Sequence, residues 1–132
     1  MSVFVSEETF DLVIYMLPRY ADSVLLSVDI LPDDSIPDTQ TVICKCKGRD
    51  AATMSTVMEN ATIINHVTGE PMVRVSVLYP QVILSFFTEW NLLAEDGSTT
   101  LITNHTVGRL HDTVRKALAK KWLNMTGSKN YA

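Results

Sequence analysis

A long apolar stretch near the middle of the chain constrains the fold more than any other feature. Residues 72–90 are almost wholly apolar, and Arg74 and Glu89 are their only charged members. Such a stretch must be shielded from water, so it predicts the centre of the core. Pro80 divides it, and proline is well tolerated in the first turn of a helix. The residues indicate a strand or short helix over 72–79 and a helix from near Pro80, with a single kinked helix as the alternative.

The first forty residues predict a helix, a strand and an acidic loop. Ser6 is a typical N-cap residue, and two glutamates follow it. Residues 23–31 suit a strand or a buried connector, and residues 32–39 contain two prolines and three aspartates. Pro18 indicates that the first helix ends nearby. The apolar residues with the spacing of one helix face are Phe10, Val13, Ile14 and Leu17.

Residues 41–47 alternate between apolar and polar positions, which predicts a half-buried strand. Cys44 and Cys46 fall on its apolar face, and Gly48 ends it. Asp50 is placed to cap a following helix. The apolar stripe of that helix comprises Ala51, Met54, Val57, Met58, Ala61 and Ile64. Residues 66–71 then form a turn.

The C-terminal part predicts a turn and two helices. Asp96 and Gly97 form a turn signal, and Thr103 or Asn104 caps the first helix. Gly108 breaks that helix, and Asp112 caps a second one running to residue 125. Its apolar stripe comprises Val114, Ala117, Leu118, Trp122 and Met125.

These elements predict an α+β fold: a predominantly helical single domain with a small antiparallel sheet or hairpin. The domain spans residues 1–132. Within it lie an acidic N-terminal segment (1–40), a strand–helix core with an amphipathic C-terminal helix (41–125) and a polar tail (126–132).

The net charge of −4 conceals a gradient along the chain. Residues 1–38 contain eight acids and one base, whereas residues 109–132 contain six bases and one acid. This polarity suits a basic surface that meets nucleic acid or an acidic partner, or head-to-tail stacking of identical subunits. A solvated helix face is the simpler alternative.

Motifs for catalysis or metal binding do not occur in the sequence. There is no nucleophile elbow, phosphate loop or zinc-protease motif. The three histidines lack ligand spacing, and the acidic loop lacks the alternating oxygen ligands and central glycine of a calcium loop. Cys44 and Cys46 are expected to be buried thiols. We therefore predict a non-enzyme with no catalytic residue, no metal site and no cofactor.

The bases of the last helix are the one feature that favours nucleic acid. Trp122 falls on the apolar stripe rather than among these bases, and the chain as a whole is acidic, with a pI of about 5.2. A small nucleic-acid-binding or regulatory module is thus the alternative function. No apolar run is long enough for a membrane span, and the acidic start does not resemble a signal peptide, so a cytoplasmic location is expected. The bases are Arg115, Lys116, Lys120 and Lys121.

Residues 86–110 resemble small morphogenesis proteins of tailed bacteriophages, including those called tail assembly chaperones. The resemblance is carried by FFTEWNLLAEDG at residues 86–97, LIT at 101–103 and VGRL at 107–110. The strand-to-helix step CKGRDAATM at residues 46–54 is also similar.

This resemblance implies a non-enzymatic structural or morphogenesis protein that acts through subunit contacts in head or tail assembly. Its expected partners are other phage structural proteins or copies of itself, with no membrane and with nucleic acid disfavoured. It would work in the host cytoplasm during assembly, and its incorporation into the virion stays open. The interface candidates are Trp90, Leu92, Asp96, Gly97, Arg115, Lys116, Lys120, Lys121 and Trp122.

Overall fold

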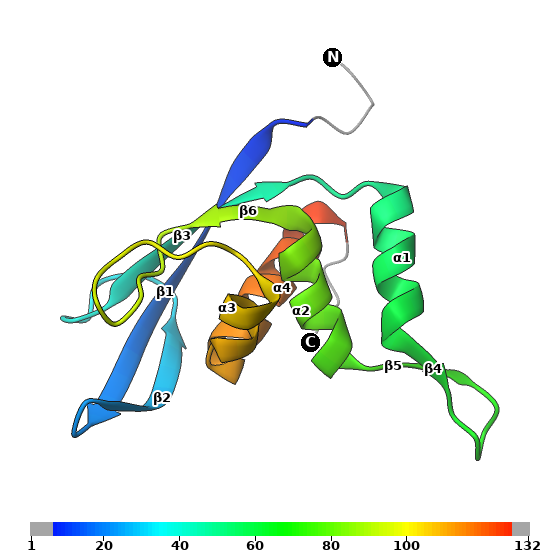
Figure 1. The fold of residues 1–132 in the computed structure, drawn as a ribbon, viewed down its shortest axis with the longest axis horizontal. Helices are drawn as coiled ribbons and strands as arrows, with labels where there is room; N and C mark the ends of the chain where they lie inside the picture. The colour runs from blue at the N-terminus through cyan, green and yellow to red at the C-terminus, as the bar shows by residue number, and fades with distance from the viewer. Residues whose placement is uncertain (1–6, 128–132) are drawn as a thin grey trace.

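The computed structural model describes residues 7–127 of the chain (Figure 1). In this part of the chain, four helices accompany a four-stranded antiparallel sheet and a two-stranded ribbon. In chain order, the elements are β1 (Thr9–Ala21), β2 (Val24–Leu31), β3 (Gln40–Lys47), α1 (Ala51–Ala61), β4 (Thr62–Ile64), β5 (Pro71–Val73), α2 (Val75–Phe86), β6 (Phe87–Trp90), α3 (Asn104–Arg109) and α4 (Asp112–Thr126).

The larger sheet has the strand order β2-β1-β3-β6. Its buried side chains share one face, because Leu12 lies opposite Cys44 and Ile14 lies opposite Val42. Helix α4 packs against β1 and β2, and α2 packs against α4 and α1. The core therefore lies between one face of the sheet and the helices, while the β4–β5 ribbon projects from the far end of α1 (Figure 1).

The prediction of a predominantly helical fold is wrong. The described residues are 36% helical and 34% strand. Most of the difference comes from β1, which replaces the helix predicted near residues 10–17. Its apolar residues are dense enough to satisfy both a helical and an alternating pattern. Non-local pairing decides between them, because β1 pairs with β3 over eight residues and with β2 over seven.

Two residues were expected to mark the start and the end of that helix, and neither does so within the described residues. Pro18 does not end β1, since β3 pairs with this strand only as far as Met16 and leaves one side of β1 open beyond it. Ser6, the expected N-cap, lies outside the described residues.

Strand β3 and helix α1 form as predicted. Val42, Cys44 and Cys46 are all buried on the helix-covered face of β3. The Asp50 carboxylate accepts a hydrogen bond of 2.8 Å from the Thr53 amide and caps α1. The helix ends at Ala61, so Ile64 belongs to β4 and not to the helix stripe.

The apolar stretch at residues 72–90 divides into three elements. Residues 71–73 form the short strand β5, and α2 runs through Pro80 as one helix. The predicted division into two elements at Pro80 is therefore wrong, and of the alternative, a single kinked helix, the continuity across Pro80 holds for residues 75–86. The helix ends at Phe86, and residues 87–90 form β6 beside β3. The helix predicted from near Pro80 thus begins earlier, at Val75, and the strand after it was not predicted.

The two C-terminal helices are close to the prediction. Thr103 caps α3, and its hydroxyl accepts a hydrogen bond from the Thr106 amide. The N-cap of α4 is His111 rather than Asp112, because His111 Nδ1 accepts from the Thr113 amide. Met125, expected in the apolar stripe, is 50% exposed. Of the predicted polar tail, residues 128–132 lie outside the described residues.

Trp122 is the centre of the packing between α4 and its neighbours. Its ring stacks on Phe86 of α2 with centroids 4.1 Å apart, and its indole N–H donates to the Lys47 carbonyl at 2.9 Å. The Arg49 guanidinium lies 5.3 Å from the centroid of the tryptophan ring, which is a cation–π distance. Arg49 also donates to the Leu123 carbonyl at 3.0 Å. These contacts tie the end of β3 to the last turns of α4.

Candidate interaction surfaces

Arg115 serves the fold and is not a free cation. Its guanidinium donates to the carbonyls of Val107 at 3.2 Å and Leu110 at 2.7 Å, and it pairs with Asp112 at 2.8 Å. These carbonyls lie at the end of α3, where a helix leaves its last carbonyls without intrahelical partners. The side chain of Arg115 thereby joins α3 to α4.

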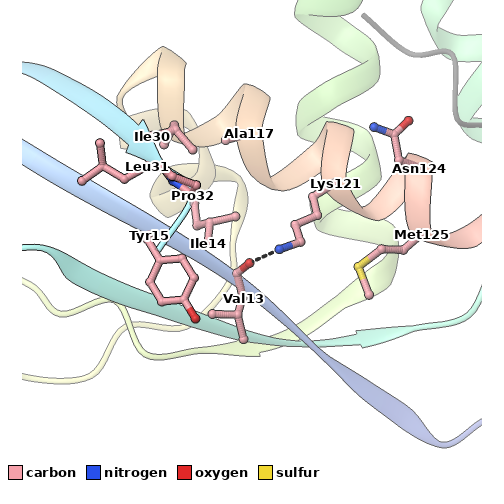
Figure 2. Close-up of a pocket in the computed structure, with 10 residues that line it drawn as sticks. All are labelled: Val13, Ile14, Tyr15, Ile30, Leu31, Pro32, Ala117, Lys121, Asn124 and Met125. Atoms are coloured by element: carbon pink, nitrogen blue, oxygen red, sulfur yellow. Dashed lines mark hydrogen bonds between the residues drawn. The ribbon is translucent and has the colours of Figure 1, made fainter. Parts of the chain in front are cut away.

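Lys121 lies in a groove between α4 and the sheet (Figure 2). Its ammonium group donates to the Val13 carbonyl. That carbonyl is available because β2 pairs with β1 only from Tyr15 onward. Lys121 thus covers a backbone edge that no strand of the described chain covers. Such a lysine protects the edge from pairing with another chain.

The groove has a volume of about 560 Å³, and its lining is mainly apolar. Lys121 and Asn124 supply its nitrogen donors, and Met125 lies beside them on α4 (Figure 2). A surface with this lining can receive an apolar side chain. From β1, β2 and the residue after β2, the lining residues are Val13, Ile14, Tyr15, Ile30, Leu31 and Pro32.

Lys116 and Lys120 are the other two predicted bases of α4. Lys116 is exposed and Lys120 is partly buried. Loss of hydration lowers the pKa of Lys120, and the nearby charge of Lys116 lowers it further. Of the four bases, Arg115 and Lys121 are engaged with backbone carbonyls, and this reduces the basic face that the sequence suggested.

The remaining interface candidates shape the loop after β6. Trp90 is buried, and its indole N–H donates to the hydroxyl of Thr100 at 2.8 Å. Leu92 packs against the core from the same loop. Trp122 is fully buried, as described above, and contributes no surface.

Asp96 and Gly97 form the predicted turn in this loop. Asp96 accepts from the amide and the hydroxyl of Ser98, and these hydrogen bonds hold the pKa of its carboxyl below the ordinary value. Gly97 has a φ of +83°, which glycine adopts without strain. The turn is exposed, so a partner can reach it.

Sixteen large apolar side chains are exposed in the described chain, and most of them lie on two hairpins. We call residues 19–31, the hairpin of β1 and β2, the edge hairpin, and residues 62–75, around β4 and β5, the arm. The edge hairpin exposes Tyr20, Val24, Leu25, Leu26 and Ile30. The arm exposes Ile63, Ile64, Val67, Met72, Val73 and Val75.

Sequence reasoning missed both surfaces. It predicted residues 23–31 as a strand or a buried connector. It divided the arm among the end of a helix that included Ile64, a turn at 66–71 and a strand or short helix from residue 72. The apolar residues were visible, but nothing in a single sequence says which apolar strand other elements cover. The turn at residues 66–71 with Gly69 was the one local signal for a hairpin there.

Cys44 and Cys46 are free thiols. Burial raises the pKa of the Cys44 thiol to about 12, and it raises that of Cys46 as well. A neutral buried thiol is a poor nucleophile, so neither residue is suited to covalent chemistry at neutral pH. Across residues 7–127, no three side chains of the metal-binding types gather into a metal site.

None of the helices in residues 7–127 has the length and apolar character needed to cross a bilayer. Comparison of the chain with protein-family models, curated proteins and solved structures finds no match.

Proposed function

We propose that this chain is a non-enzymatic morphogenesis protein of a tailed bacteriophage that acts through contacts between protein subunits in head or tail assembly. The observation that carries the proposal is the exposed apolar surface on the arm and the edge hairpin. Exposed apolar side chains concentrated on two hairpins favour a protein interface there. Two such surfaces on one small chain suit a protein that works in an assembly.

The assignment to phage morphogenesis is supported by the resemblance of residues 86–110. In the structure, these residues form the end of α2, strand β6, its loop and α3. Trp90 anchors the loop through Thr100, and Thr106 closes the capping box of α3.

The alternative of a nucleic-acid-binding module gains no separate support. Arg115 and Lys121, two of the four bases assigned to it, donate to backbone carbonyls of the same chain. Phosphate binding by this helix would have to rely on Lys116 and Lys120, and affinity rises with the number of phosphate contacts.

Deletion of the gene tests the proposed function. The expected result is a loss of infectious particles, with unjoined heads or incomplete tails in electron micrographs of the lysate. A plasmid copy of the wild-type gene should restore assembly and serves as the control. Unchanged particle yield in the deletion strain would overturn the proposal.

Mass spectrometry of purified particles then separates two roles within the proposal. A structural subunit is present in fixed copy number in the particle and acts there. An assembly chaperone is found in the cytoplasm of the infected host and is missing from the particle. Presence in the particle and absence from it are both compatible with a morphogenesis protein, and the result shows whether the chain acts in the particle or in the host cytoplasm.

A further inference from the structure

Two apolar projections lie at opposite ends of the molecule. In Figure 1 the turn of the edge hairpin and the tip of the arm lie toward opposite ends of the longest axis. Five exposed large apolar side chains lie on the edge hairpin and six on the arm, out of sixteen in the described chain. Two separate patches allow one molecule to contact two neighbours at once.

We infer that the arm of one copy packs on the edge hairpin of the next copy, so that identical chains join head to tail. The inference rests on the proposed function in subunit assembly, and it names the partner as a second copy and the two surfaces that meet. Such a contact is heterologous: it forms a ring if the rotation closes and a filament if it does not.

The arm lacks the packing that a short ribbon needs. Strands β4 and β5 pair over three residues only, with Ile63 opposite Met72 and Thr62 opposite Val73. A two-stranded ribbon is marginal in water unless another surface packs on it. Yet Ile64 is 53% exposed and Val67, at the tip, is 94% exposed. A partner that covers these side chains would supply the missing packing.

The edge hairpin can receive the arm because β2 is the outer strand of the sheet. No strand of the described chain pairs with the outer side of β2, so backbone N–H and C=O groups on that side are open. Val24 and Leu26 are 61% and 62% exposed. The eight residues of β2 include no lysine or proline, the residues that commonly protect an edge strand. A register shift between Arg19 and Tyr20 alters the pairing near the turn, but the remainder of the edge is regular.

Charge favours the arm over a second edge hairpin as the occupant. The edge hairpin and the loop after it carry Asp22, Asp29, Asp33, Asp34 and Asp38 against Arg19 alone. A two-fold contact between edge hairpins would bring two such acidic groups together, and like charges across an interface are costly. The arm carries one acid and one base, Glu70 and Arg74, and brings no such repulsion.

The area available suits a weak contact. The eleven exposed apolar side chains of the two hairpins present on the order of 1,000 Å² in total, and because neighbouring strand residues point to opposite faces, one contact covers only part of this area. Single contacts of this size are typically weak, and repetition around a ring or along a filament strengthens them.

Four proteins test the inference by sedimentation velocity over about 1 to 200 μM, a range that covers weak interfaces. These are the wild type, an arm variant (Ile64→Ser with Val67→Ser), an edge variant (Val24→Ser with Leu26→Ser) and a control, Leu101→Ser. Leu101 is 80% exposed but lies on neither hairpin. We expect the wild type and the control to grow beyond dimers as concentration rises. Each hairpin variant should stay monomeric, with association weakened at least tenfold.

An equal mixture of the two hairpin variants gives the sharpest result. The edge variant keeps an intact arm, and the arm variant keeps an intact edge hairpin. The mixture should therefore form a dimer of one copy of each and stop there. Circular dichroism checks that each variant is folded, and Leu26→Lys alone replaces the edge variant if that one unfolds.

Three results would overturn the inference. They are a wild type that is monomeric at every concentration, a wild type that stops at a dimer, and a mixture that stays monomeric. None of them decides the proposed function, which is tested separately by gene deletion and particle yield. A chain that never self-associates but is needed for particles would have another protein as its partner.

Discussion

Strand β3 and the arm are built from similar residues but differ in what covers them. In β3, Val42 and both cysteines are buried, with β1 on one side and β6 on the other. In the arm, Ile64 and Val67 are largely exposed, and each strand has only the other as its partner. Apolar composition is thus common to the two regions, and burial separates them.

The difference suggests a division of roles between the two regions. Burial of apolar surface is the main favourable term in folding, so the stability of the chain should depend on the residues around β3, α2 and α4. The arm should add little to folding, and its apolar side chains are available for association. Substitutions can test this division, because core changes should lower stability and arm changes should lower association.

Trp122→Ala should produce the largest loss of stability. The substitution removes a fully buried ring, its stacking on Phe86 and its hydrogen bond to Lys47. We expect the free energy of unfolding to fall by about 3–5 kcal/mol in denaturant titrations. Met125→Ala, on the same helix but half-exposed, is the matched control and should cost less than about 1 kcal/mol. Similar losses for both would contradict the packing described for α4.

Arg115→Met should cost less, about 1–3 kcal/mol. Methionine keeps much of the aliphatic length but removes the donors that serve the carbonyls of Val107 and Leu110. Lys116→Met, at the next position, is the control and should change stability by less than about 0.5 kcal/mol. If the two variants unfold alike, Arg115 is a surface cation, and the nucleic-acid alternative regains it.

Local signals predicted the elements that depend on them. The alternation at residues 41–47 gave β3, and Asp50 and Thr103 marked the starts of α1 and α3. Alternation and helix capping depend on residues that lie within a few positions of one another, so a single sequence shows every residue that they need. The helix α4 was also predicted, although His111 rather than Asp112 caps it.

Long-range contacts decided what the sequence could not. The residues of β1 fit both a helix and a strand, and pairing with β2 and β3 selects the strand. Trp122 was proposed for an interface but is covered by Phe86 and Arg49. The arm and the edge hairpin were missed as surfaces, because exposure depends on which elements pack over a strand.

The buried thiols of β3 predict a loss of stability at high pH. In the unfolded chain a cysteine ionises near its ordinary pKa of 9.0, whereas the pKa of Cys44 in the folded protein is raised to about 12. The folded state therefore holds the proton more tightly. The contribution of this thiol to stability is therefore constant below about pH 9 and falls as the pH rises from 9 towards 12.

Cys44→Ala provides the comparison for this effect. By pH 10.5 the wild type should lose roughly 1–2 kcal/mol more than the variant, relative to each protein at pH 7.5. Chemical denaturation across this pH range measures the difference. Equal losses in the two proteins would mean that this part of β3 is open to water. Other groups also titrate in this pH range, but the variant contains the same groups, so their contributions to the difference between the two proteins cancel.

Val67→Ala should have the smallest effect and gives the most direct test of the comparison. The same substitution at Val57, a residue of α1 that is 2% exposed, should cost about 1.5–3 kcal/mol, because it removes buried methyl groups and leaves a cavity. At Val67, which is 94% exposed, the change in unfolding free energy should stay within about 0.5 kcal/mol. Both values should be measured at low protein concentration, so that association does not contribute.

Equal costs at the two valines would mean that the arm folds back onto the core in solution, and the division between a folding core and an associating arm would then fail. A neutral Val67→Ala that nevertheless weakens association would assign this side chain to the contact between subunits, because stability and association would then respond to different residues.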